Sequence, residues 1–155
     1  MEKRTLLARQ RASEKRAMKR RLAEWGQALE LCGRKQEELR RVEKLQQEQR
    51  EILAENPTEQ ARAAMEQSEG GYAEAIRRIQ GEIAAILRKK AEMDEQLCML
   101  TGEEQSFVIM RYEKGYSLDY IGIKLHMSRA TVFRIQQRAL EKLLEMEKRA
   151  VMESA

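Results

Sequence analysis

The stretch "SLDYIGIKLHMSRATVFRI", residues 117–135, contains two short apolar stripes separated by a break at His126-Met127. Ser117 and Ser128 stand where the two stripes begin, and serine is a preferred N-cap residue of α-helices. Between them, Gly122 permits a neighbouring helix to approach closely. The residues expected to face inward are Leu118, Ile121 and Leu125 in the first helix and Val132, Ile135, Ala139 and Leu143 in the second. A short helix, a tight break and a capped helix predict a helix-turn-helix unit.

A further helix is predicted directly before this unit. Thr101 and Glu104 have the spacing of a capping box, and Gly115 supplies a stop. The inward positions of this helix are expected to be Phe107, Val108 and Tyr112. Together, the three predicted helices form a small C-terminal domain.

The outward face of the last helix is the candidate DNA-binding surface. In a helix-turn-helix, the N-terminal residues of this helix enter the major groove. Arginine there can make a bidentate contact with guanine, and Thr or Phe can touch a thymine methyl group. The outward residues are Arg129, Ala130, Thr131, Phe133, Arg134, Gln137 and Arg138. Ser117, Ser128 and the helix N-termini suit phosphate groups. A plain helical pair with a solvated basic face is the alternative, but it leaves Phe133 unexplained.

Composition favours helices throughout the 155 residues. Charged residues make up 36% and aromatic residues 5%, and there is a single proline. The apolar residues are mostly Leu, Ile, Ala and Met, which favour helix, and no stretch alternates as a strand would. The sequence therefore predicts an all-α protein.

A regular apolar stripe in residues 72–100 predicts a long helix. Its members follow a four–three spacing, which only Lys90 interrupts: Tyr72, Ile76, Ile79, Ile83, Ile86, Lys90, Met93, Leu97 and Leu100. A second, less regular stripe precedes it: Leu22, Trp25, Leu29, Cys32, Leu39, Val42, Leu45, Ile52 and Leu53. Asn56-Pro57 ends the first helix, and Gly70-Gly71 offers a hinge before the second. Residues 58–68 are left open between a short helix and a loop.

Two stripes separated by breakers predict a long antiparallel helical hairpin. A homo-oligomeric coiled coil is the rival. A two-helix hairpin buries little by itself, so dimerisation or packing on the C-terminal domain is expected. Glycines at 26 and 33 weaken the first helix, so its start is expected to be bent or mobile. The predicted organisation is a basic extension at 1–21, a hairpin at 22–99 with a break near 56–71, the helix-turn-helix domain at 100–149 and a tail at 150–155.

Positive charge is concentrated at the ends of the chain. Residues 1–21 carry nine Lys or Arg against two Glu, whereas residues 22–100 carry twelve against sixteen. The N-terminal segment is left open between a solvated or disordered extension and an arm that contacts nucleic acid phosphates. No apolar run reaches the ~20 residues that span a bilayer, and the basic start lacks the pattern of a signal peptide. Cys32 and Cys98 are expected to be reduced and buried, and we expect a cytoplasmic protein without membrane contact.

Residues 100–143, "LTGEEQSFVIMRYEKGYSLDYIGIKLHMSRATVFRIQQRALEKL", resemble the fourth conserved region of bacterial sigma factors. The similarity lies in the "RY…G-S" lead-in, "YIG", "S-R-A-T-V" and the closing "ALEKL". With the preceding helices, the chain resembles phage and prophage regulators with sigma-like C-terminal domains, including late-gene activators of the ArpU type.

The resemblance implies a role at promoters together with RNA polymerase. It implies that Arg129, Ala130, Phe133 and Arg134 read bases and that Arg138 lies nearer the backbone. Tyr120 and Gly122 replace the usual acidic residue and alanine. His126 stands where glycine is common, which implies a left-handed turn residue and not a ligand or base.

The expected function is therefore a sequence-specific DNA-binding transcription regulator. Residues 1–100 offer only Trp25 and Tyr72 as aromatic residues, so unaided promoter melting is not expected. The expected partners are double-stranded DNA, RNA polymerase and a second copy bound through the hairpin. A phage DNA-packaging recognition subunit and a purely structural coiled coil are the alternatives. With one His and no nucleophile–base arrangement, we expect no enzyme activity, cofactor or metal.

Overall fold

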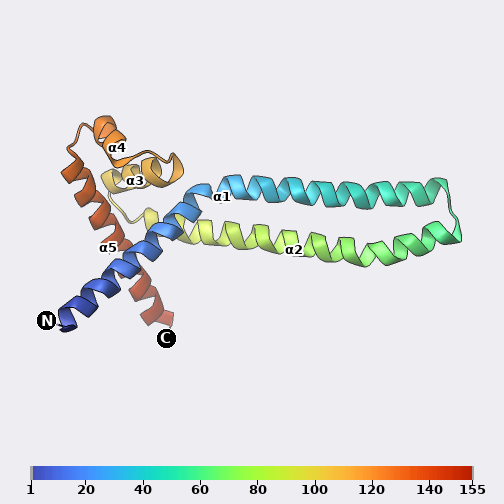
Figure 1. Ribbon diagram of the computed structural model, residues 1–155, viewed down its shortest axis with the longest axis horizontal. Helices are drawn as coiled ribbons and strands as arrows, with labels where there is room; N and C mark the ends of the chain where they lie inside the picture. Colours follow the sequence, from blue (N-terminus) through green and yellow to red (C-terminus); the bar gives the residue numbers. More distant parts are fainter. Residues whose placement is uncertain (1, 155) are drawn as a thin grey trace. The chain divides into compact units, whose positions relative to one another are not determined.

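The computed structural model describes residues 2–154, and every regular element within them is a helix. In chain order these are α1 (Glu2–Glu55), α2 (Glu59–Leu97), α3 (Gly102–Val108), the π-helix η1 (Ile109–Glu113), α4 (Leu118–Leu125) and α5 (Arg129–Ser154), as Figure 1 shows. The prediction of an all-α chain, with a long helical hairpin followed by a helix-turn-helix, is confirmed.

The chain forms two compact units. The hairpin unit comprises residues 28–88, and the domain unit comprises residues 2–27 together with residues 89–154. Both α1 and α2 contribute to each unit, because each helix runs through a unit boundary.

In the hairpin unit, α1 and α2 run antiparallel and pack along a seam (Figure 1). The α1 side of this seam follows a strict four–three spacing of buried or half-buried residues: Ala28, Cys32, Lys35, Leu39, Val42, Gln46, Gln49 and Leu53. The α2 side carries the predicted residues from Tyr72 to Ile86. The polar seam residues have partners across the seam. Lys35 Nζ lies 2.7 Å from Glu82 Oε2, and Gln46 Nε2 donates to Glu69 Oε1 at 3.1 Å.

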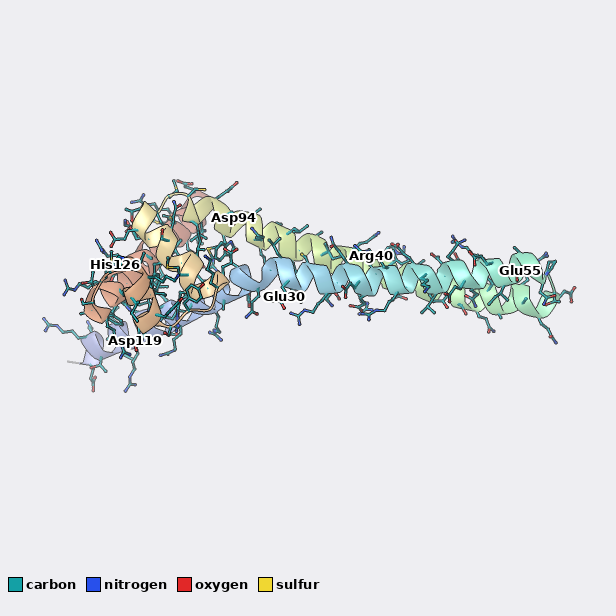
Figure 2. All side chains as sticks on the ribbon, turned by 90° about the horizontal axis from the view of Figure 1, so that it is seen from above. Glu30, Arg40, Glu55, Asp94, Asp119 and His126 are labelled. Atoms are coloured by element: carbon teal, nitrogen blue, oxygen red, sulfur yellow. The ribbon has the colours of Figure 1, made fainter. Side chains whose placement is uncertain are left out.

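Three residues of the predicted α1 stripe do not face this seam. Leu29, Leu45 and Ile52 are exposed, by 63%, 52% and 60% of their surface. Each stands one position from a seam residue, so the four–three register turns it outward. Figure 2 shows charged side chains such as Arg40 and Glu55 projecting from the hairpin in the same way.

The break between the two long helices is shorter than predicted. Residues 56–58 interrupt the helix, and Thr58 Oγ1 accepts a hydrogen bond from Ala61 N at 3.1 Å. Residues 59–68 are helical, and Gly70-Gly71 lie inside α2 instead of forming a hinge. Contacts just before the glycines hold α2 to α1, because Glu69 binds Arg50 at 2.7 Å and Ser68 binds Gln49 at 3.3 Å.

The core of the domain unit joins α1, α2 and the C-terminal helices. Its buried members include Met18, Leu22, Met93, Leu97, Leu100, Phe107, Val108, Ile121, Val132, Ile135, Ala139, Leu140 and Leu143. Of the two alternatives left open for residues 1–21, a solvated or disordered extension does not describe the packed part around Met18. Met18 is 1% exposed because it continues the apolar spacing of Leu22 and packs in this core.

The remaining differences lie at Gly26, Cys98 and the C-terminus. At Gly26, where a bent or mobile start was expected, α1 is a continuous helix and its backbone packs closely on η1. Cys32 is buried as predicted, but Cys98 is exposed, since Leu97 and Leu100 take the inward positions beside it. The expected tail at 150–155 is helical as far as Ser154, because α5 continues without a breaker.

Local signals in the C-terminal helices act as expected. Thr101 caps α3, and its hydroxyl accepts a hydrogen bond from Glu104 N at 3.2 Å. Gly115 adopts a φ of 72°, which ends the helical run before α4. The π-helix was not foreseen. Its wider turn is closed by Lys114 N donating to Ile109 O at 3.0 Å.

Candidate nucleic-acid interface

The turn between α4 and α5 fixes the angle of the two helices. His126 is left-handed, with φ 56° and ψ 46°, which confirms its predicted role as a turn residue. Met127 N donates to Gly122 O at 2.8 Å. A Cβ atom on Gly122 would lie 2.8 Å from Met127 O, so a larger residue would force this turn apart. Glycine at 122 thus permits the close approach that the sequence predicted.

The serine caps begin α4 and α5 at this surface. Ser117 Oγ accepts from Tyr120 N at 3.2 Å, and Ser128 Oγ accepts from Thr131 N at the same distance. Ser128 Oγ also lies 2.9 Å from Thr131 Oγ1. Both serines are exposed, so the first turns of the two helices can be approached from solvent. Free backbone N–H groups at helix N-termini attract anions such as phosphate.

One side of α5 is buried and the opposite side is open. Val132, Ile135, Ala139 and Leu143 are at most 1% exposed, as predicted. The open side carries a surface that we term the reading face: Ala130, Phe133, Arg134 and Gln137, with Arg129 and Arg138 at its flanks. Phe133 is 51% exposed and stands beside Arg134. An apolar ring between exposed guanidinium groups can contact base edges and methyl groups as well as phosphates.

Some predicted site residues are half-buried or contact other side chains of the protein. Thr131 is half-buried at the rim, where its hydroxyl meets Ser128. Arg129 Nε lies 3.5 Å from Asp119 Oδ1 of α4, with both side chains exposed. Gln137 is half-buried, because Lys15 of α1 donates to its Oε1 at 2.7 Å. Arg134 and Arg138 are exposed, and neither makes an ion pair within residues 2–154.

The sequence prediction missed Lys15 and Asp119 as residues that contact this surface. Lys15 could have been found, since it precedes Met18 and Leu22 in the same three–four spacing and so lies on the packed side of α1. Asp119 gave a weaker signal, because its contact with Arg129 depends on the angle between α4 and α5. Tyr120 is also near, stacking edge-on with Tyr116 at 4.7 Å and lying 5.6 Å below Lys124 Nζ.

An ion pair between the buried Glu104 and the exposed Lys142 links α3 to α5. Glu104 is 2% exposed, and its Oε1 accepts hydrogen bonds from Lys142 Nζ and from Thr101 Oγ1. Burial alone would raise the pKa of Glu104, but the hydrogen bonds from Lys142 and Thr101 outweigh it and lower the pKa. The ionised pair therefore ties the start of α3 to the middle of α5.

Residues 97–145 match the family model described as Sigma-70, region 4. The matched segment is about a third of the chain and covers α3, η1, α4 and most of α5. These helices therefore form a sigma-like, DNA-binding helix-turn-helix domain, as the sequence resemblance predicted. Comparison of the chain with curated proteins and with solved structures finds no match.

Within residues 2–154, no helix combines the length and apolar content needed to cross a membrane. In the same residues, no group of three or more His, Cys, Asp or Glu side chains is placed to hold a metal ion.

Proposed function

We propose that this chain is a sequence-specific transcription regulator of phage or prophage origin. It selects a promoter site with α5, acts there together with RNA polymerase and performs no catalysis. The observation that carries the proposal is the exposed pair Phe133 and Arg134 on the reading face of a sigma region 4-like domain. A solvated helix face has no need of an exposed aromatic ring, whereas a surface that enters the major groove uses one.

The hairpin unit is proposed to hold two copies of the chain together. Leu31, Leu45 and Ile52 are exposed on α1 and stand at multiples of seven residues, so they share one side of the helix. Apolar residues in such a row suit the packing of another helix. Pairing would place two reading faces on one DNA molecule and raise the effective concentration of the second contact.

The test of the function is selection of bound duplexes from a random DNA pool, with the mass of the protein measured alongside. We expect enrichment of a defined sequence and the mass of a dimer. A preference for no duplex over random DNA at moderate salt would contradict the regulator. A large ring would instead favour a DNA-packaging recognition subunit.

Arg134→Ala tests the reading face directly. If Arg134 contacts a base, the variant should lose roughly 1–3 kcal/mol of binding free energy and relax the preference at one base pair. Arg149→Ala is the control, because Arg149 is an exposed arginine near the end of the same helix. Binding isotherms on the selected duplex and on its single-base variants measure both effects. A uniform loss on every duplex would make Arg134 a phosphate contact.

A further inference from the structure

The helix α1 crosses α5 on the same side that carries the reading face. Ala130, Arg134, Gln137, Glu141, Leu144 and Lys148 follow a four–three spacing and so lie along one side of α5. Ala130 and Arg134, at the start of this row, are exposed. From Gln137 onward the row meets α1, where Lys15 Nζ lies 2.7 Å from Gln137 Oε1 and 3.4 Å from Glu141 Oε1.

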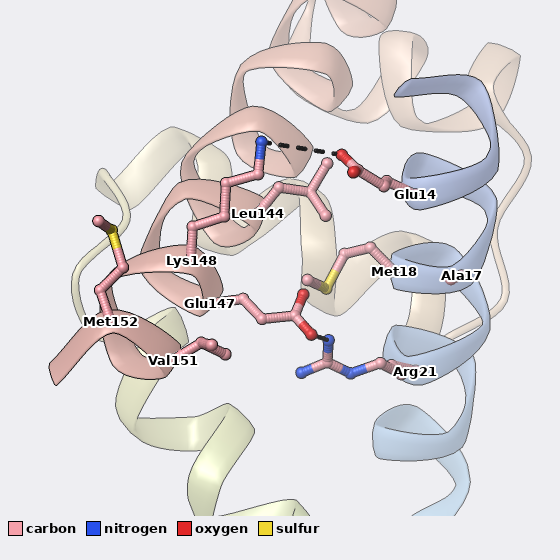
Figure 3. A pocket seen from close by; sticks show the side chains of 9 residues that line it. All are labelled: Glu14, Ala17, Met18, Arg21, Leu144, Glu147, Lys148, Val151 and Met152. Carbon is pink, nitrogen blue, oxygen red and sulfur yellow. Dashed lines mark ion pairs between the residues drawn. The ribbon is translucent and has the colours of Figure 1, made fainter. Parts of the chain in front are cut away.

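Further ion pairs lie at this crossing. Arg21 Nη1 lies 2.9 Å from Glu147 Oε1, and Lys148 Nζ lies 4.0 Å from Glu14 Oε2. Figure 3 shows both pairs beside Met18 and Leu144, which line the apolar pocket between the two helices. The first turns of α1 therefore continue outward from a defined contact with α5.

The side of α1 that packs on α5 becomes basic beyond this crossing. Arg4, Ala8, Arg11, Lys15, Met18 and Leu22 follow one four–three spacing, so they share a side of the helix. Met18 and Leu22 are buried, whereas Arg4 and Arg11 are exposed. Residues 2–21 contain nine Lys and Arg residues. Of these nine, only Lys15 and Arg21 make ion pairs within residues 2–154.

DNA bound to the reading face would run beside α1. The major groove is about 12 Å wide, and Glu141 lies about 16 Å along the helix axis from Ala130 at 1.5 Å per residue. A helix that crosses α5 at Gln137 and Glu141 therefore lies at the edge of the groove, where the phosphates of one strand run. The exposed arginines of α1 have the charge that these phosphates attract.

We propose that α1 is a second DNA-binding element, in which Arg4 and Arg11 contact the phosphate backbone of the duplex that α5 reads. The inference rests on the proposed function, because it takes duplex DNA as the ligand of α5. In this role α1 strengthens binding and fixes the position of the protein on the duplex, whereas the reading face selects the bases.

The salt dependence of binding by the full chain tests the inference. The affinity of Arg4→Gln/Arg11→Gln is measured between low and moderate salt on the selected duplex and on a random duplex. Log affinity falls with log salt, and each phosphate contact adds about 0.9 to the steepness of that fall. The double variant should therefore reduce the steepness by about 2. Its preference for the selected sequence should not change.

Arg9→Gln/Arg16→Gln is the matched control. Arg9 and Arg16 are exposed and lie on the opposite side of α1, and the variant removes the same charge. We expect it to change the slope by less than half as much. Equal slopes for the two double variants, or no change in either, would overturn the inference and leave α1 as a surface for a protein partner. The proposed function fails by a different result, in which the unmodified chain shows no preference for the selected duplex.

Discussion

At Gly26 the backbone of α1 lies against the carbonyl group of Tyr112 in η1. A Cβ atom at this position would come within 1.9 Å of Tyr112 O, a contact that the backbone must relieve by moving. The glycine that the sequence marks as a weak point in a helix is therefore a packing residue. Glycine lowers helix propensity by about 1 kcal/mol here, but only glycine lets the two backbones pack this closely.

Gly26→Ala should lower the free energy of unfolding of the domain unit by about 1–3 kcal/mol, because overpacking outweighs the gain in helix propensity. Urea unfolding followed by the fluorescence of Trp25, the single tryptophan, measures this loss. Gly33→Ala is the control, since no atom lies within 4 Å of its added Cβ. It should be neutral or stabilising by up to about 1 kcal/mol in circular dichroism. Equal stability of Gly26→Ala and the unmodified chain would contradict the packing role.

Glu104 makes the stability of the domain unit depend on pH. The folded state lowers the pKa of Glu104, despite its burial, through hydrogen bonds from Lys142 and Thr101. The stabilisation is therefore fully present above the unfolded-state pKa of about 4.3. It is lost as the pH falls from there through the lower pKa of the folded state.

Glu104→Gln should destabilise the domain unit at pH 7 by roughly 1.5–3 kcal/mol, since it removes a hydrogen-bonded charge from a buried position. The difference from the unmodified chain should shrink as the pH falls below about 4.3. Glu103→Gln is the control, because Glu103 is exposed beside it. Thermal unfolding across this pH range measures both variants, and a loss that is independent of pH would show that Glu104 is not ionised in the folded state.

The helix α2 continues through Gly70-Gly71 although two glycines in a row weaken a helix. No atom lies within 4 Å of a Cβ added at either position, so neither glycine is needed for a close approach. Contacts of Ser68 and Glu69 with α1 hold the helix just before them.

The double substitution Gly70→Ala/Gly71→Ala should stabilise the hairpin unit by about 1–2 kcal/mol, because each alanine raises helix propensity by up to about 1 kcal/mol. Helical circular dichroism during urea unfolding measures the change. A loss of helical signal or of stability would mean that the chain needs a flexible joint at these residues. Gly81→Ala, at another open position of α2, supplies the single-glycine reference.

The elements that the sequence predicted best carry their own local signals. The caps at Thr101, Ser117 and Ser128 and the left-handed turn at His126 each depend on a few adjacent residues. The seam residues of α2 were also predicted well, because their four–three spacing is regular. The seam of α1 was predicted less well, because Lys35, Gln46 and Gln49 occupy inward positions that only their partners across the seam make acceptable.

At the candidate site, too, the contacts that the sequence did not predict depend on partners from other helices. Helical spacing and caps were enough to predict which side of α5 is open. The contacts of Lys15 with Gln137 and of Asp119 with Arg129 join segments far apart in sequence or separated by a turn. They follow from the angles at which helices cross, and no local pattern encodes those angles.

The core of the helix-turn-helix domain includes side chains from outside the C-terminal helices. Met18, Leu22, Met93 and Leu97 are all at most 7% exposed in the core that also contains Phe107 and Leu143. These four side chains come from α1 and α2, outside the C-terminal helices. The long helices thus complete the DNA-binding domain as well as forming the hairpin.

A fragment of residues 100–149 should therefore be unfolded or only loosely packed. Burial of one large apolar side chain contributes about 1.5–3 kcal/mol, so the loss of four is comparable with the total stability of a domain, about 5–15 kcal/mol. In contrast, residues 2–27 joined to residues 89–154 by a short Gly/Ser linker retain the whole core and should unfold in one cooperative transition. Thermal circular dichroism and the dispersion of amide NMR signals distinguish the two shortened chains. Cooperative unfolding of the 100–149 fragment near the temperature of the joined chain would show that the core contributed by α1 and α2 is dispensable.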